Sequence, residues 1–330
     1  MKLNQIKWGI IGCGNVTEVK SGPAFQKAEH SSLVAVMRRN KEKAADYARR
    51  HGVPKWYHQA DDLINDPEVN AIYIATPPDT HAQYAIQAMR AGKPVYVEKP
   101  MALNHAECQK MIAVSKETGM PLFVAYYRRT LPAFLKMKEL VESGVIGKPI
   151  SVSITLVKGA SEQDKNTSND NWRVDPKAAG AGYFFDLASH QLDYLDFLFG
   201  PITRVAGTAV NRGGLYRAED TVVASFAMES GVVGNGLWSF VADESATKDD
   251  LEIIGTKGKI NLPSFQHTDL KLTTAKGTLS FSFQNPENIS YNLVDQVVQS
   301  LRGEAECVST GVSAARTNWV MEQIVQDYYH

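Results

Sequence analysis

The sequence predicts an α/β protein in two parts: a doubly wound parallel sheet, then an α+β domain with a large, mainly antiparallel open sheet. Up to about residue 125, short apolar runs alternate with helical patterns at the spacing of βαβ units. From about residue 150, strand-like runs follow one another with turn residues between them, as in hairpins. A chain of 330 residues also suits two cores better than one. We therefore predict domains at 1–125 and 126–330, with last helices that could pack back on the first domain.

Composition and charge argue against several classes of protein. The chain is 44% hydrophobic and 22% charged, and its formal net charge of −1 argues against a broad nucleic-acid or membrane surface. No apolar run approaches the roughly 20 residues that span a bilayer, and the early first strand leaves no room for a signal peptide. The three widely spaced cysteines match neither a disulfide framework nor a metal motif. We expect a reduced, cytoplasmic protein without a metal site.

The first strand, residues 7–11, runs directly into a glycine turn. Glycines there can adopt positive φ and let a pyrophosphate approach the backbone, and the helix that follows would attract phosphate with its first amides. Thr17 replaces the third glycine of the dinucleotide-binding fingerprint, so the match is incomplete. Many Gly-x-Gly sequences are plain turns, but the place of this one at the first strand–helix junction indicates a Rossmann domain. The residues expected at the phosphates are Gly12, Gly14, Asn15 and Val16.

The second strand, residues 32–37, ends in Arg38 and Arg39, where NAD-binding domains carry an acidic residue for the ribose. Guanidinium groups form forked hydrogen bonds with phosphate oxygens, which a carboxylate would repel. We therefore favour NADP(H) over NAD(H), with NAD(H) still possible. The alternative interpretation is a basic, solvated entrance to the next helix.

Three more strands, at 70–75, 95–97 and 122–126, alternate with helices predicted at 41–51, 61–64, 82–91 and 106–118. Ligands of open α/β sheets bind at the carboxyl ends of the strands. The Glu-Lys-Pro sequence that ends the middle strand would hold a lysine there on a fixed backbone, although a lysine that only solubilises the strand end is the alternative. The side chains that we place at this edge are Thr76, Pro77, His81, Glu98, Lys99 and Arg128.

In the second half, strands and turns alternate at the regular spacing of hairpins, and a helix predicted at 183–199 interrupts them. Two further helices, at 291–302 and 312–328, end the chain. We predict a loop at 161–171. The predicted strands are 150–157, 205–210, 221–228, 231–240, 250–255, 258–262, 269–274 and 277–283.

Asp186 and His190 are four residues apart in the interrupting helix, which would place both on one helical face with Cβ atoms about 6 Å apart. A histidine exchanges protons near neutral pH, and a neighbouring carboxylate can orient it. Small residues at 178–182 would let a ligand lie close. A purely structural pair is the equal alternative.

Together these motifs resemble the glucose-fructose oxidoreductase/inositol dehydrogenase (Gfo/Idh/MocA) family over nearly the whole chain. The motifs that carry the resemblance are the glycine turn, Thr76-Pro77-Pro78 with His81, Glu98-Lys99-Pro100, and Asp186 with His190. The resemblance implies that Lys99, Asp186 and His190 form the catalytic set. It also implies that Trp172, Arg173 and Tyr291 lie near the cofactor. Thr17 and Arg38 depart from the family pattern, and the second departure favours NADP(H).

The resemblance implies an NAD(P)-dependent oxidoreductase acting on a secondary alcohol or carbonyl of a sugar, cyclitol or related polyol. Two alternatives remain: a nicotinamide-dependent glycosidase of the same family, and a non-catalytic NADP(H)-binding sensor. The expected partners are a small-molecule substrate and further copies of this chain, in a homodimer or homotetramer formed through the C-terminal sheet. Neither nucleic acid nor membrane is expected as a partner.

Overall fold

The computed structural model describes residues 2–165, 171–266 and 268–329. The chain divides into two compact units: unit 1 comprises Met1–Arg129 with Asn285–Ala315, and unit 2 comprises Thr130–Gln284 with Arg316–His330. The end of the first segment lies four residues beyond the predicted boundary at residue 125. The chain also returns to unit 1 near its end, so the penultimate helix belongs with the first unit.

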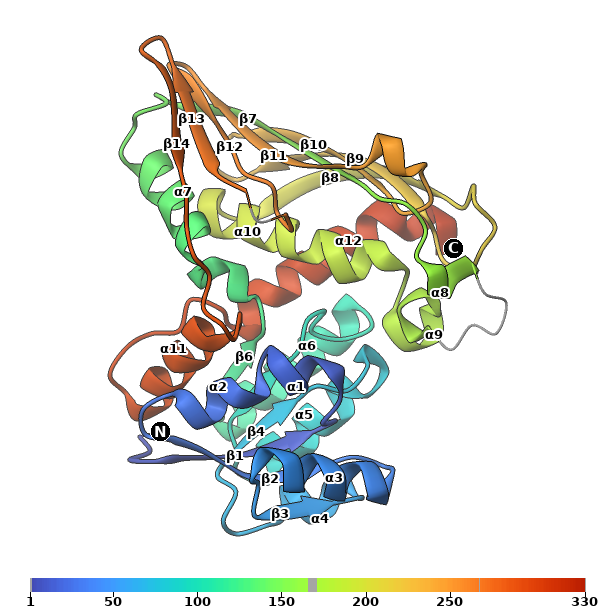
Figure 1. Ribbon diagram of the computed structural model, residues 1–330, viewed down its shortest axis with the longest axis vertical. Helices are drawn as coiled ribbons and strands as arrows, with labels where there is room; N and C mark the ends of the chain where they lie inside the picture. Colours follow the sequence, from blue (N-terminus) through green and yellow to red (C-terminus); the bar gives the residue numbers. More distant parts are fainter. Residues whose placement is uncertain (1, 166–170, 267, 330) are drawn as a thin grey trace. The chain divides into compact units, whose positions relative to one another are not determined.

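In its described part, unit 1 contains a six-stranded sheet in which every neighbouring pair is parallel (Figure 1). The edge strand of residues 55–57 was not predicted, because a run of only three residues is too short to show a strand pattern. The strands in spatial order are β3 (Lys55–Tyr57), β2 (Ser31–Met37), β1 (Ile6–Ile11), β4 (Ala71–Ile74), β5 (Val95–Val97) and β6 (Leu122–Val124).

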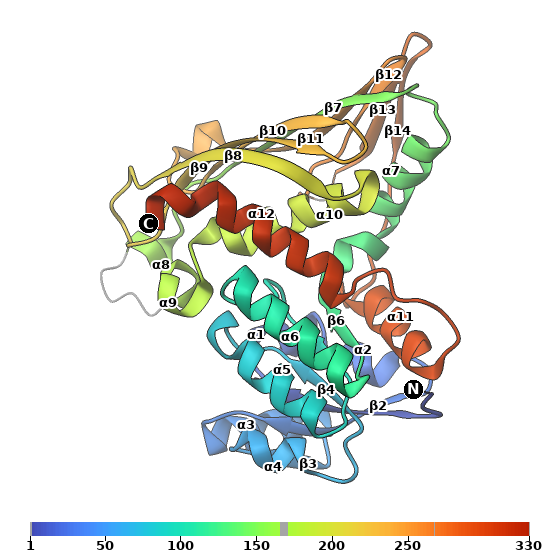
Figure 2. The same ribbon diagram turned by 180° about the vertical axis from the view of Figure 1, so that it is seen from behind.

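Helices cover both faces of this sheet, as in a doubly wound fold (Figures 1 and 2). One apolar cluster joins the sheet to α4, α5 and α6, and another joins its opposite face to α2, α3 and α11. Local sequence sets the helix ends: Asn40 caps α3 by accepting from the Lys43 amide, and Gly52 ends it at φ 63°. The helices are α1 (Asn15–Val19), α2 (Gly22–Lys27), α3 (Lys41–His51), α4 (Ala60–Ile64), α5 (His81–Arg90), α6 (His105–Thr118) and α11 (Tyr291–Arg302).

Unit 2 has an eight-stranded sheet within its described residues, antiparallel except for the parallel pair β7 and β10. This confirms the mainly antiparallel second sheet. Helices pack on one face of it; for example, α12 approaches β8 where Gly207 leaves room for Ile324 (Figure 2). The strands in spatial order are β14 (Gly277–Phe281), β13 (Leu270–Thr274), β12 (Gly258–Asn261), β11 (Lys248–Gly255), β7 (Pro149–Val157), β10 (Val233–Ser239), β9 (Thr221–Met228) and β8 (Ile202–Val210).

The helices of unit 2 differ from the prediction in two places. The helix predicted at 183–199 begins as a π-helix, Phe184–Ala188, before α10 starts. The predicted loop at 161–171 contains a short helix, α8, and its residues 166–170 lie outside the described residues. The α-helices are α7 (Pro132–Glu142), α8 (Glu162–Lys165), α9 (Pro176–Ala179), α10 (Ser189–Phe199) and α12 (Gly311–Tyr329), of which α12 begins in unit 1.

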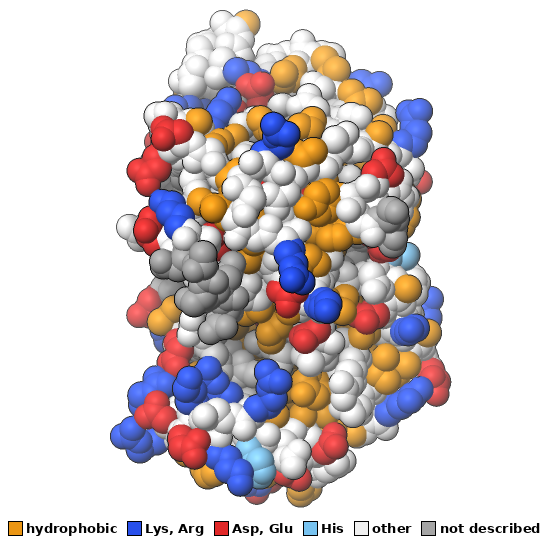
Figure 3. All heavy atoms as spheres, turned by 90° about the vertical axis from the view of Figure 1, so that its right-hand side faces the viewer, with side chains coloured by type: hydrophobic (Ala, Val, Ile, Leu, Met, Phe, Trp, Pro, Cys, Tyr) orange, Lys and Arg blue, Asp and Glu red, His pale blue; other side chains and the backbone are white. Residues whose placement is uncertain are grey.

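Within the described ranges, no helix is both long and apolar enough to cross a membrane. Lys and Arg side chains are interspersed with Asp and Glu on the face shown in Figure 3. This distribution agrees with the near-zero net charge of the sequence.

Candidate active site

The glycine turn after β1 packs tightly against the end of β4. Gly12 has φ +94°, and a Cβ atom added there would lie 2.7 Å from the Thr76 side chain and 2.8 Å from its backbone nitrogen. Only glycine satisfies both demands. Gly14 is extended, at φ −138°, and precedes Asn15, which is exposed, and Val16, which is partly buried, in α1. A glycine turn at the carboxyl edge of a parallel sheet is where dinucleotides bind in folds of this kind.

The helix after the turn, α1, is short, with five residues. Thr17, which stands at the third fingerprint position, is fully buried, and its hydroxyl donates to the Gly14 carbonyl at 2.8 Å. The third glycine of the fingerprint usually allows two backbone segments to pack closely. Here Gly22 allows this packing, since a Cβ atom added there would lie 2.1 Å from the Thr17 carbonyl oxygen. The substitution at position 17 is therefore accommodated by the break between α1 and α2.

Arg38 lies over the glycine turn. Its Nη1 donates to the Cys13 carbonyl at 3.2 Å, whereas Arg39 is exposed. This bond holds a guanidinium group beside the turn that would carry the phosphates. Cys13 is buried, and burial raises the pKa of its thiol to about 11, so it is an unreactive residue that fills space in the turn.

His81 connects two of the strand ends. The ring is fully buried, with Nδ1 3.0 Å from the Pro100 carbonyl oxygen and Nε2 2.8 Å from that of Thr76. Burial lowers the pKa of His81 to about 4, so the neutral ring donates to one carbonyl at a time. Its side chain thus supports the Thr76-Pro77 turn, and any effect on a cofactor is indirect.

Glu98 is held by a hydrogen bond from the Tyr73 hydroxyl to its Oε1, and the Lys99 amide lies 3.3 Å from its Oε2. Burial raises the pKa of the Glu98 carboxyl, and the Tyr73 bond and the Lys99 charge oppose this shift. Lys99 follows two residues after β5, as predicted, and its bond to Pro100 is cis. Lys99 therefore stands at the carboxyl end of a buried strand of the parallel sheet.

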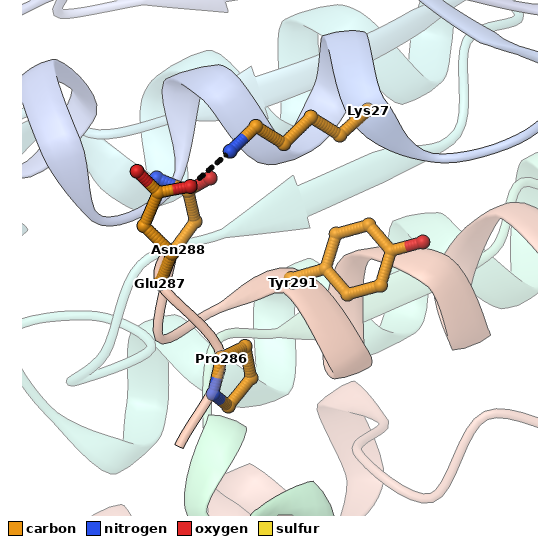
Figure 4. A pocket seen from close by; sticks show the side chains of 5 residues that line it. All are labelled: Lys27, Pro286, Glu287, Asn288 and Tyr291. Carbon is orange, nitrogen blue, oxygen red and sulfur yellow. Dashed lines mark hydrogen bonds and ion pairs between the residues drawn. The ribbon is translucent and has the colours of Figure 1, made fainter. Parts of the chain in front are cut away.

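Arg128 and Tyr291 also lie in unit 1. Arg128 is buried and donates to the Tyr127 hydroxyl at 2.9 Å. Tyr291 opens α11, as predicted, and lines a pocket of about 280 Å³ with the Lys27–Glu287 ion pair (Figure 4). Pro286 and Asn288 complete the lining of this pocket.

In unit 2, the predicted Trp172–Arg173 pair contacts Asp186, the acid that we predicted in the catalytic set. The Arg173 guanidinium stacks 4.5 Å from the centre of the Trp172 ring, and its Nε lies 3.3 Å from Oδ2 of Asp186. Asp186 sits in the π-helix, a distortion that is frequent at functional sites. The expectation of an α-helical face shared by Asp186 and His190 therefore needs correction, because the turn that joins them is not α-helical.

His190 is 4% exposed and lies in the first turn of α10. The neighbouring residue, Gln191, accepts from the indole nitrogen of Trp238 at 2.7 Å and donates to the Ser264 hydroxyl at 2.9 Å. These buried bonds fix the rotation of α10, and with it the position of the imidazole.

Glu219 is a buried acid that sequence reasoning missed. Both of its carboxylate oxygens lie 3.0 Å from the amide of Gly182, just before the π-helix, and Oε2 accepts from the Tyr329 hydroxyl. A Cβ atom at Gly182 would lie 2.7 Å from the Glu219 carbonyl oxygen, which explains the glycine. Burial raises the pKa of Glu219 to about 7, above its ordinary value of 4.5.

Replacing Glu219 with glutamine is expected to remove a pH-dependent loss of stability. Between pH 4.5 and 7 the unfolded chain releases the proton that folded Glu219 retains, so this group lowers the free energy of unfolding as pH rises. The total loss is about 3 kcal/mol. Urea unfolding at pH 4.5, 6 and 7.5 should show the variant gaining stability relative to wild type with rising pH. Glu229→Gln, at an exposed turn, is the control; parallel curves for Glu219→Gln and wild type would contradict the prediction.

The parallel sheet and its glycine turn define a dinucleotide-binding oxidoreductase. Residues 6–126 match the family model described as "Oxidoreductase family, NAD-binding Rossmann fold", and residues 134–261 match "GFO/IDH/MocA C-terminal domain". The chain belongs to the Gfo/Idh/MocA family of nicotinamide-dependent sugar and polyol oxidoreductases.

Relatives of known name support this membership. Oxidoreductase P35 of Formosa agariphila is 41% identical over 302 residues, covering 89% of this chain and 90% of that protein. The scyllo-inositol 2-dehydrogenase (NAD(+)) of Bacillus subtilis is 28% identical over 319 residues, covering 93% and 87%. Levoglucosan dehydrogenase in complex with NADH and L-sorbose has the same fold, with a TM-score of 0.89 at 22% identity over 99% of this chain and 97% of that one.

Proposed function

We propose that this protein is an NADP(H)-preferring oxidoreductase that interconverts a secondary alcohol and a carbonyl on a neutral sugar, cyclitol or related polyol. The observation that carries the proposal is Lys99, which follows β5 at the sheet edge that also carries the glycine turn. Relatives named scyllo-inositol 2-dehydrogenase and 1,5-anhydro-D-fructose reductase support the substrate class.

When bound, the nicotinamide would accept or supply the hydride. We assign the cofactor to Gly12, Gly14, Asn15, Val16, Arg38, Arg39, Thr76, Pro77, Glu98, Lys99, Arg128, Trp172, Arg173 and Tyr291, with His81 acting through the turn that it supports.

The chain's own residues would manage the proton and the charge. His190 would take the hydroxyl proton during oxidation and return it during reduction. Lys99 would donate a hydrogen bond to the reacting oxygen and stabilise its developing negative charge. Asp186, paired with Arg173, would bind a neighbouring hydroxyl of the substrate and orient the imidazole. Because Arg173 is paired with Asp186, its charge is less available to an anionic substrate, which favours a neutral one.

Arg38 is expected to set the cofactor preference. Replacing it with alanine removes a charged donor beside the turn, so kcat/KM for NADPH should fall about 10- to 100-fold while that for NADH changes little. Steady-state kinetics with both cofactors measure this ratio. The control is Lys116→Ala, an exposed basic residue of α6. An unchanged ratio in Arg38→Ala would contradict NADP(H) selection by this residue.

We also propose that the outer face of the second sheet joins copies of this chain into a homodimer or homotetramer. Leu237 of β10 and Val223 of β9 are paired across the strands, yet are 37% and 52% exposed. Val233, also on β10, is 49% exposed. An open sheet with apolar side chains on its free face buries them best against a second sheet.

Replacing Leu237 with lysine is expected to lower the oligomeric state, because the charge would have to be desolvated in an apolar interface. Light scattering coupled to size-exclusion chromatography measures the mass. Val312→Lys changes an exposed apolar residue of α12 and should leave the mass unchanged. If wild type and Leu237→Lys have the same mass, this face is not the interface.

The test of the proposed function follows nicotinamide absorbance with a panel of cyclitols, sugars and ketosugars, using NADP(H) and NAD(H) separately. Turnover supports the proposal. Cofactor binding without any redox change, together with release of a leaving group from glycosides, would instead identify a nicotinamide-dependent glycosidase.

A further inference from the structure

Phe265 lies beside His190 within unit 2. The centres of the two rings are 6.2 Å apart and their planes meet at 69°, an edge-to-face arrangement. His190 is almost fully buried, whereas Phe265 is partly exposed. An aromatic surface therefore remains accessible next to the proposed proton-exchanging residue.

The turn that carries Phe265 is held by a carboxylate from the sheet. Asp249 of β11 accepts backbone hydrogen bonds from Ser264 at 2.8 Å, Phe265 at 2.6 Å and Gln266 at 2.9 Å. Asp249 is itself 9% exposed. Three charge-assisted bonds to consecutive amides fix the backbone of the turn.

The same turn is tied to the helix that carries His190. The Ser264 hydroxyl accepts from Gln191, and Gln191 in turn accepts from the buried indole of Trp238. Phe265 is thus fixed relative to His190 by connections through both β11 and α10. A turn held in this way is preorganised, so little conformational entropy would be lost when a ligand packs against the Phe265 ring.

We propose that Phe265 is a specificity-determining residue: its ring is the wall against which the carbon face of a ring-shaped substrate packs beside His190. Asp249 is the positioning residue that holds the wall in place. A cyclitol or pyranose has an apolar face of C–H groups within a polar rim, and this face complements an aromatic ring. An open-chain polyol has no such fixed face and would gain less. The inference rests on the proposed function, since it names a substrate feature read by the same site.

The kinetic test compares myo-inositol with D-mannitol, each with saturating NADP⁺, in wild type, Phe265→Leu, Phe265→Tyr and Asp249→Asn. Phe265→Leu should raise KM for myo-inositol about tenfold with kcat within about twofold, and leave D-mannitol nearly unchanged. Phe265→Tyr should restore the wild-type preference, and Asp249→Asn should lose part of it. Phe283→Leu, at another partly exposed phenylalanine, is the control. Equal changes for both polyols would overturn the proposal.

A binding measurement keeps this inference separate from the proposed function. Saturation-transfer NMR of the same two polyols, with NADP⁺ present, needs no turnover. Stronger transfer to the myo-inositol C–H protons in wild type than in Phe265→Leu would support the aromatic wall even if no polyol is oxidised, an outcome that would count against the proposed function alone. Equal saturation transfer to myo-inositol in both proteins would contradict the role of Phe265 even if the enzyme oxidises the polyol. The His190 ring protons should also shift in Phe265→Leu, because a neighbouring aromatic ring has been removed.

Discussion

Replacing Lys99 with alanine is expected to lower kcat about 10²- to 10³-fold, while the Kd for NADPH changes by less than about threefold. The reason is the position of the Lys99 ammonium group at the end of a strand. A lysine at a strand end is already oriented before the substrate arrives, so its hydrogen bond to the reacting oxygen strengthens as negative charge develops. An interaction that is stronger in the transition state than in the ground state raises kcat more than it affects binding.

The measurement combines steady-state kinetics with a fluorescence titration of NADPH. Lys99→Arg keeps the positive charge but changes its geometry, and should recover part of the lost rate. Lys116→Ala, on the exposed face of α6, controls for the loss of a lysine as such. A Lys99→Ala protein that loses cofactor affinity and kcat to the same extent would contradict the assigned role and indicate that Lys99 mainly holds the cofactor.

Replacing His190 with alanine is expected to lower kcat about 10²- to 10⁴-fold and to flatten the dependence of the oxidation rate on pH. A general base must be deprotonated before it accepts the hydroxyl proton, so oxidation by wild type should accelerate as pH rises through the titration of this group. Without the imidazole, only solvent bases remain, and hydroxide gives a different pH profile.

The pH dependence of kcat/KM between pH 5 and 9 checks this prediction. Added imidazole should restore part of the rate in His190→Ala, because the lost side chain leaves space for it in unit 2. The control is His30→Asn: His30 is exposed and has φ +57°, a conformation that asparagine tolerates. A His190→Ala variant that keeps the wild-type pH profile would assign the proton transfer to another group.

Sequence reasoning succeeded where the information is local. The strand ending at Val97 was predicted from three β-favouring residues followed by Glu98-Lys99-Pro100, and it agrees with β5. The helix predicted at 41–51 agrees with α3, because Asn40 and Gly52 are a local start signal and a local stop signal. Strands that alternate with helices also predicted the parallel sheet without any knowledge of which strands pair.

Sequence reasoning did not reach features that depend on contacts between distant segments. His81 was placed at the cofactor edge from its position after a strand, and the structure shows its ring buried between the Pro100 and Thr76 carbonyl oxygens, which its neighbours in the sequence do not indicate. The π-helix that carries Asp186 also escaped, because its sequence satisfies an α-helical pattern. Neither feature leaves a signal in neighbouring residues.

The sequence alone therefore determined the succession of the longer elements, the two kinds of sheet, the family and the residue types available for chemistry. These follow from side-chain periodicity, turn residues and short motifs, all of which act over a few residues. The tertiary structure decided which side chains are buried and which meet. Phe265 stands beside His190 because Asp249, sixteen residues earlier in the chain, binds its amide, and Glu219 titrates near neutral pH because the fold removes it from water. Burial and long-range hydrogen bonds exist only once the chain has folded, so no local pattern encodes them.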